Sequence, residues 1–166
     1  MSLRIDAHAH ICPAFEVDAL LRHMDGAGVH RAVLLQGSYY GDQNARVKRA
    51  VRAHPDRFAG ALFLDPWADP ALSALDQLAD FAGVKLECSV PTGFYGLHPE
   101  ARLDDDAVYR LCAALEAAGK VLTLDLGGIG SRSYETDAVA ELAGAHPGLK
   151  IVLAHMGQPA PDMDAK

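Results

Sequence analysis

The chain has 166 residues, half of them hydrophobic, with 15 basic and 22 acidic side chains and a formal net charge of −7. This composition excludes intrinsic disorder, and an acidic balance without a basic stripe argues against a nucleic-acid partner. No apolar run approaches the ~20 residues that cross a bilayer, and the N-terminal residues show no signal-peptide pattern. The three cysteines are widely spaced and form no Cys-x-x-Cys pair, which favours reduced thiols in a cytoplasmic protein.

Short apolar runs alternate with amphipathic stretches along the whole chain. We expect strands at residues 3–11, 31–37, 58–65, 83–89, 120–128 and 150–157. Helix-like segments lie between them, at residues 15–28, 43–55, 69–83, 103–120 and 133–148. The third helix would begin at Asp69 and Pro70, an Asp-Pro start signal. This alternation indicates one α/β domain with parallel strands joined by right-handed crossovers.

Five strand–helix units and a sixth strand account for nearly all of the chain. An eight-stranded barrel normally needs about 200 residues or more. The chain is therefore either an open six-stranded sheet or a barrel without its last quarter. The longest irregular stretch, residues 89–106, has a length typical of functional loops. Its Phe94, Tyr95 and His98 are interpreted as ordinary loop packing or as residues at a substrate entrance.

Two histidines, His8 and His10, stand at the end of the first expected strand. Side chains at i and i+2 of a strand point to the same face, so both imidazoles can reach one ion. The C-terminal ends of parallel strands are also where α/β folds place their sites. The spacing alone is a weak motif, and it leaves open a metal pair or two side chains that merely share a face.

Three later strands also carry polar side chains at or near their ends. His155 follows the sixth strand, where a lone histidine is more often an ordinary core or surface residue. Asp125 ends the fifth strand. Its three interpretations are a metal ligand, a partner of a histidine and a helix cap. Lys85 and Glu87 alternate with apolar residues in the fourth strand. They are interpreted either as a structural ion pair or as an active-site pair. Polar residues at the ends of four strands together indicate a functional site more strongly than any one of them does.

Five blocks of sequence together resemble the metal-dependent amidohydrolase superfamily. They are IDAHAHI (5–11), HPDRFAGALFLDP (54–66), GVKLE (83–87), VLTLDLGGIG (121–130) and IVLAHMGQP (151–159). The similarity is greatest to the amidohydrolase-related branch that includes the aminocarboxymuconate semialdehyde decarboxylase-like enzymes. It covers essentially the whole chain and implies a TIM-type (β/α)8 barrel, of which about six strands are present here. It also implies one or two divalent metal ions, most often zinc, at the C-terminal mouth.

The resemblance further implies roles for single residues. His8 and His10 match the first-strand metal ligands, and His155 matches a histidine that is an acid/base in one-metal members and a ligand in two-metal members. Lys85 matches a lysine that is carbamylated in some relatives and contacts substrate in others. The family commonly has histidine where this chain has Asp125, although a carboxylate can also bind zinc. The expected metal set is His8, His10, Asp125 and His155, and the expected catalytic set is His155, Lys85 and Glu87.

The family's last ligand is an aspartate at the end of an eighth strand. Asp162 and Asp164 lie in the tail, but nothing in residues 158–166 resembles a strand that ends in this aspartate. We therefore expect residues 1–166 to form a single barrel domain whose C-terminal quarter is missing from this chain or is supplied by a partner.

The implied activity is hydrolysis of an amide, lactone or ester bond of a small molecule by metal-activated water. His155 would act as general base and then acid, and Lys85 would stabilise the oxyanion. Decarboxylation of an unsaturated or aromatic acid and a non-catalytic truncated barrel are the alternatives. A nucleotide-binding sheet is disfavoured because no G-x-G-x-x-G follows the first strand. No membrane partner is expected, and a homo-oligomer is left open.

Overall fold

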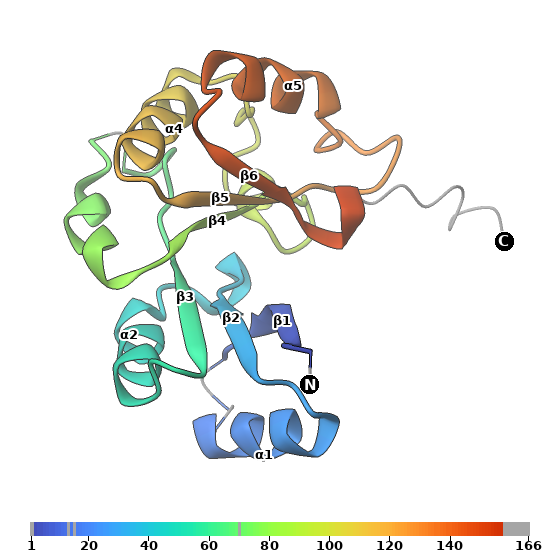
Figure 1. Ribbon diagram of the computed structural model, residues 1–166. Helices are drawn as coiled ribbons and strands as arrows, with labels where there is room; N and C mark the ends of the chain where they lie inside the picture. Colours follow the sequence, from blue (N-terminus) through green and yellow to red (C-terminus); the bar gives the residue numbers. More distant parts are fainter. Residues whose placement is uncertain (1, 13, 15, 70, 158–166) are drawn as a thin grey trace, which may run out of the picture.

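Six parallel strands form one curved sheet in the computed structural model, which describes residues 2–12, 14, 16–69 and 71–157 (Figure 1). The strands hydrogen-bond in chain order, from β1 to β6. They are β1 (Ile5–His10), β2 (Arg31–Leu35), β3 (Phe58–Leu62), β4 (Gly83–Glu87), β5 (Val121–Asp125) and β6 (Lys150–Leu153). The expected parallel sheet is confirmed.

The sheet curls as an open barrel, and β3 joins its two halves (Figure 1). β3 pairs with β2 through Phe58, Ala59 and Gly60, and with β4 through Ala61 and Leu62. Within the described residues β1 and β6 are the two edges, and no ladder joins them. These edges expose apolar side chains, among them Ile5, Val152 and Leu153. The architecture is that of a (β/α) barrel with six of its strands.

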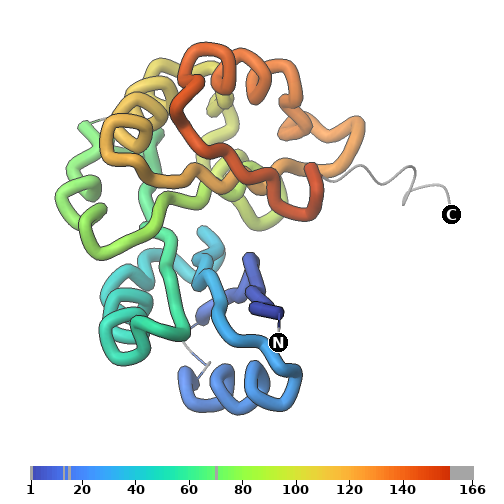
Figure 2. Tube along the Cα trace, in the orientation of Figure 1, coloured from blue at the N-terminus to red at the C-terminus, as the bar shows by residue number. Residues whose placement is uncertain are grey.

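Helices follow most strands and lie on the outer face of the curl, as the trace in Figure 2 shows. The longer ones are α1 (Val17–Ala27), α2 (Asn44–Ala53), α4 (Asp106–Ala117) and α5 (Thr136–Ala145), and a short α3 (Phe94–Leu97) lies after β4. The described residues also form three 3₁₀ helices: η1 (Ser38–Tyr40), η2 (Ser73–Asp80) and η3 (Ala154–Gly157). Among the described residues no helix is long and apolar enough to cross a membrane.

The segment between β3 and β4 differs from the expected α-helix at residues 69–83. It forms the 3₁₀ helix η2, which begins at Ser73. The Asp69 carboxylate accepts hydrogen bonds from the Ser73 hydroxyl, at 2.7 Å, and from the backbone N–H of Ala74, at 3.3 Å. Leu72 adopts a left-handed backbone with φ of 53°, so the chain turns sharply just before η2. Pro70, the other half of the expected start signal, lies outside the described residues.

The long loop after β4 is packed into the protein by its aromatic residues. Phe94 and Tyr95 are each 1% exposed. The Tyr95 hydroxyl donates to Glu135, and the Arg132 guanidinium lies over the Tyr95 ring at 4.8 Å while donating to the Ala101 carbonyl. Of the two interpretations of Phe94 and Tyr95, the structure supports loop packing.

The core lies between the sheet and the surrounding helices. In β4, Val84 and Leu86 are fully buried among apolar residues. Lys85 points to the opposite face, because successive strand residues alternate. There it meets side chains of β1 and β5. The inner face of the curl therefore holds polar groups, as the alternation in the fourth strand predicted.

Gly83 allows β4 to approach β5. A Cβ at this position would lie 2.0 Å from the carbonyl oxygen of Val121, its partner in the ladder. We expect Gly83→Ala to lower the free energy of unfolding by about 3 kcal/mol, since two backbones must separate. The control is Gly26→Ala in α1, where a Cβ meets nothing within 4 Å and should stabilise by about 0.5–1 kcal/mol. Urea unfolding measures both, and equal midpoints would contradict the close approach.

Candidate active site

A bulge in β1 positions the first two histidines. β1 pairs with β2 in register at Asp6 and Ala32, but Ala9 then pairs with Leu34, so β1 contains one extra residue between these points. The Asp6 carboxylate accepts a hydrogen bond from the backbone N–H of His8 at 2.9 Å, inside the bulge. Bulges of this kind turn side chains toward active sites.

The imidazoles of His8 and His10 lie together on the inner face. Their Nε2 atoms are 2.9 Å apart, and their ring centroids are 4.8 Å apart. The structure therefore brings this predicted pair together, although the bulge between Asp6 and Ala9 interrupts the regular strand.

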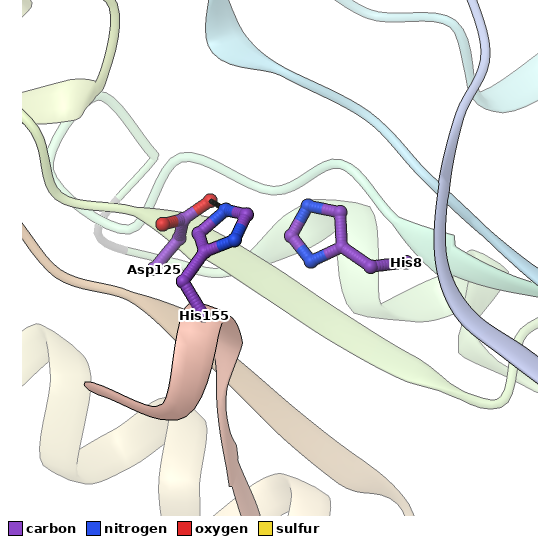
Figure 3. Close-up of side chains that lie close together, drawn as sticks. All are labelled: His8, Asp125 and His155. Carbon is purple, nitrogen blue, oxygen red and sulfur yellow. Dashed lines mark ion pairs between the residues drawn. The ribbon is translucent and has the colours of Figure 1, made fainter. Parts of the chain in front are cut away.

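Two groups from the far end of the sheet join the pair, and Figure 3 shows them beside His8. Asp125, at the end of β5, is 7% exposed, and the His155 Nε2 lies 3.7 Å from its Oδ2. The rings of His8 and His155 have centroids 4.7 Å apart. One ligand atom from each of His8, Asp125 and His155 lies within 4.8 Å of the other two. These three residues come from β1, β5 and the turn after β6.

His155 is held by an unusual backbone. It belongs to η3, directly after β6, and both His155 and Met156 have left-handed φ values, 50° and 56°. Non-glycine residues rarely adopt this region, and where they do the strain is commonly found at functional sites. This turn ends β6 at Leu153, earlier than the expected strand over residues 150–157, and directs the imidazole toward Asp125.

Lys85 brings a positive charge into the cluster. Its side chain is 2% exposed, and its Nζ lies 2.9 Å from Oδ2 of Asp125 and 3.4 Å from Nε2 of His8. A buried ammonium is stable only with such partners. The structural ion pair that the sequence left open thus forms with Asp125 on the next strand rather than with Glu87.

Glu87 lies at the end of β4 but is engaged by its own loop. Its Oε1 accepts hydrogen bonds from the hydroxyls of Thr92, at 2.6 Å, and Ser89, at 3.2 Å. Its Oε2 would be 3.2 Å from a Cβ at Gly37, so it also lies against the end of β2. Glu87 therefore fixes the loop after β4 beside the cluster, and its predicted catalytic role stays a prediction.

The local environment favours neutral imidazoles. Burial, reinforced by the charge of Lys85 and by His10, lowers the pKa of His8 to about 4. Burial and then Lys85 also lower the pKa of His10. Neutral imidazole is the form that binds metal ions. A set of imidazole nitrogens with one carboxylate matches the donors that zinc and related divalent ions use, so these residues fit such a metal.

The family model described as amidohydrolase matches residues 5–165, nearly the full sequence. The chain belongs to the amidohydrolase family. No curated protein matches the sequence. The family assignment inferred from the five sequence blocks is confirmed.

Solved structures share this amidohydrolase chain's fold. An uncharacterised TIM-barrel protein from Bordetella bronchiseptica has a TM-score of 0.68 and 22% identity, over 87% of this chain and 52% of that one. A probable 2-pyrone-4,6-dicarboxylic acid hydrolase from Acinetobacter baumannii, with citric acid bound, has a TM-score of 0.61 and 18% identity. The match covers 92% of this chain and 58% of that one. A dihydroxybenzoic acid decarboxylase from Polaromonas, with bound manganese and an inhibitor, has a TM-score of 0.65 and 16% identity. The match covers 95% of this chain and 67% of that one.

These identities show a common fold and nothing finer. The amidohydrolase chain spans between about half and two thirds of the length of these three structures. Asp162 and Asp164, considered above as the family's last ligand, lie outside the described residues.

One strand-end carboxylate of this amidohydrolase was not singled out from the sequence. Asp65 follows β3, and its Oδ2 lies 2.8 Å from Nε2 of His98, in the loop after α3. Trp67 packs beside His98, with ring centroids 6.2 Å apart. The position of Asp65 at the end of an expected strand, like that of Asp125, was the available signal.

Proposed function

We propose that this chain contains the metal site of a metal-dependent hydrolase that cleaves an amide, lactone or ester bond in a small molecule. The observation that carries the proposal is the convergence of His8, Asp125 and His155 within 4.8 Å, with His10 beside them. Zinc is the first candidate because imidazole nitrogens dominate the set. The manganese of the Polaromonas decarboxylase supports a divalent ion in this fold and makes manganese the second candidate.

The bound ion would supply Lewis-acid chemistry and make water a stronger acid near neutral pH. Where His8, His10 and Asp125 hold the ion, His155 is left to move the proton, because its side chain is 53% exposed and its Nε2 faces the Asp125 carboxylate. Asp125 lies beside that imidazole, with its Oδ2 3.7 Å from the ring Nε2. His8 and His10 hold the opposite side of the cluster in their neutral state.

Decarboxylation of an aromatic acid is the second candidate function. The dihydroxybenzoic acid decarboxylase from Polaromonas has the same fold as this chain, as does the probable pyrone dicarboxylic acid hydrolase. Both reactions act on small carboxylated compounds, so their substrates form a natural assay panel.

The first experiment measures metal content and activity on the same preparation. We expect purified protein to carry close to one equivalent of zinc or manganese by mass spectrometry of the metals. The double variant His8→Ala with His10→Ala should lose that metal because two of the clustered imidazoles are removed. His23→Ala, an exposed histidine of α1, is the matched control and should keep it.

Activity is then assayed with small lactones, esters, amides and hydroxybenzoates. Turnover of a lactone, ester or amide that chelators abolish would support hydrolysis, and release of carbon dioxide from a hydroxybenzoate would favour the second candidate. Protein that carries no metal, and whose behaviour chelators leave unchanged, would contradict both.

A further inference from the structure

The candidate metal site already contains a positive charge of the protein itself. The Lys85 ammonium lies 2.9 Å from Asp125 Oδ2 and 3.4 Å from His8 Nε2. These two residues are also members of the candidate ligand cluster. Burial leaves this ammonium 2% exposed, so water cannot take over as its partner. The same two side chains that hold the ammonium would therefore also be ligands of the metal ion.

We propose that Lys85 is a built-in competitor for the metal, which neutralises Asp125 in the metal-free chain and must release it when a divalent cation binds. The inference rests on the proposed function, since it requires that a cation binds to this cluster. It concerns a different property, the affinity of the site, which Lys85 sets to a weaker value than the donor atoms alone would give.

Electrostatics supports competition over assistance. An ammonium within a few ångströms of a divalent ion repels it, and the repulsion is strong where burial lowers the effective dielectric constant. The carboxylate that offsets this repulsion, Asp125, is the one that both cations need. A neutral side chain at position 85 would leave Asp125 free for the metal and remove the repulsion.

The two roles of Lys85 predict opposite outcomes. If Lys85 were modified to a metal-bridging ligand, or if its ammonium were needed to orient Asp125 for the metal, its removal would weaken metal binding. If Lys85 competes, its removal strengthens metal binding. The sign of the change in affinity therefore decides between them without any assay of activity.

The test is titration calorimetry of metal-free protein with Zn²⁺, and separately with Mn²⁺. Lys85→Met is expected to bind at least one of these ions tenfold or more tightly than the wild type. Lys48→Met is the matched control: Lys48 also pairs with an aspartate, Asp80, but on the outside of the barrel. It should bind as the wild type does.

A second readout guards against a variant that folds poorly. Without metal, Lys85→Met should melt below the wild type because Asp125 is left buried without its ammonium. Adding Zn²⁺ should therefore raise its melting temperature by more than it raises that of the wild type. Should Lys85→Met fail to fold, Lys85→Gln removes the charge but keeps a hydrogen-bond donor, and the same two measurements apply.

The outcomes separate the inference from the proposed function. Weaker binding by Lys85→Met than by a wild type that binds metal overturns the competition and leaves the metal site standing. Binding by neither protein overturns both. Tighter binding by Lys85→Met than by a wild type that also binds the metal supports the competition directly.

Discussion

Replacing Asp125 by alanine is expected to lower the free energy of unfolding by about 3–5 kcal/mol in metal-free protein. The substitution leaves the Lys85 ammonium, 2% exposed, without the carboxylate that lies 2.9 Å from it. Truncating one partner of a buried pair costs more than the pair contributes, because the remaining charge keeps its desolvation penalty. Urea unfolding of the variant and the wild type in the presence of a chelator measures the difference.

The double variant Asp125→Ala with Lys85→Met is the control that assigns the loss to the unpaired charge. It should recover most of the stability, because neither charge is then buried alone. It should not recover metal binding, since the only carboxylate of the three-residue cluster described above is gone. A single variant as stable as the wild type would show that the Lys85–Asp125 contact contributes little to folding.

Asn44→Ala is expected to lower the free energy of unfolding by about 3 kcal/mol. The substitution disrupts a buried hydrogen-bond network at the ends of β2 and β3. The Asn44 side chain is buried; its Oδ1 accepts from Gln36 Nε2, at 2.9 Å, and from the Phe63 N–H, at 2.8 Å. Its Nδ2 donates to the Phe63 carbonyl at 2.9 Å. Alanine removes all three bonds and leaves these buried groups without their partner. Thermal and urea unfolding measure the loss.

Gln43→Ala is the matched control for Asn44→Ala. The Gln43 side chain donates to the carbonyls of Tyr40 and Asp42 in exposed surroundings, and its backbone N–H, which binds Gln36, is kept in the variant. A change within about 0.5 kcal/mol is expected, as for ordinary surface substitutions. Hydrogen exchange at the Phe63 amide should accelerate in Asn44→Ala alone, and equal exchange in both variants would contradict the network.

The strand ends could be predicted from the sequence because local rules are sufficient for them. Alternation with a period of two placed Lys85 on the face opposite Val84 and Leu86, and parallel pairing placed the ends of all strands at one rim. His8, Asp125 and His155 are therefore neighbours in space, although nearly the whole chain separates the first from the last. The resemblance to the family added the kind of chemistry, which spacing alone left open.

The contacts within the site depend on geometry that local rules do not contain. The bulge between Asp6 and Ala9 depends on the register with β2, and the left-handed turn at His155 cannot be read from the letters of an ordinary strand. Lys85 forms its ion pair with Asp125 and not with Glu87, whose carboxylate accepts hydrogen bonds from Thr92 and Ser89. Each of these features depends on a residue that is distant in sequence or on a side-chain rotamer.

The 3₁₀ helix η2 has a similar origin. The amphipathic pattern of residues 69–83 suits an α-helix, but the Asp69 carboxylate binds Ser73 and Ala74 and competes with a regular first turn. Side chains of this kind offer the backbone an alternative to helical hydrogen bonds. The pattern predicted the presence of a helix correctly and its type wrongly.

The two unpaired edges of the sheet carry a consequence for how the chain holds its shape. His8 belongs to the first strand and His155 follows the last, and their rings are 4.7 Å apart although no ladder joins β1 to β6 in the described residues. An ion shared by these histidines would link β1 to the turn after β6. A link that closes so long a loop removes more freedom from the unfolded chain than one between neighbouring strands. Metal loading would then act as a cross-link as well as a chemical group, and would couple the opening of either edge to the other.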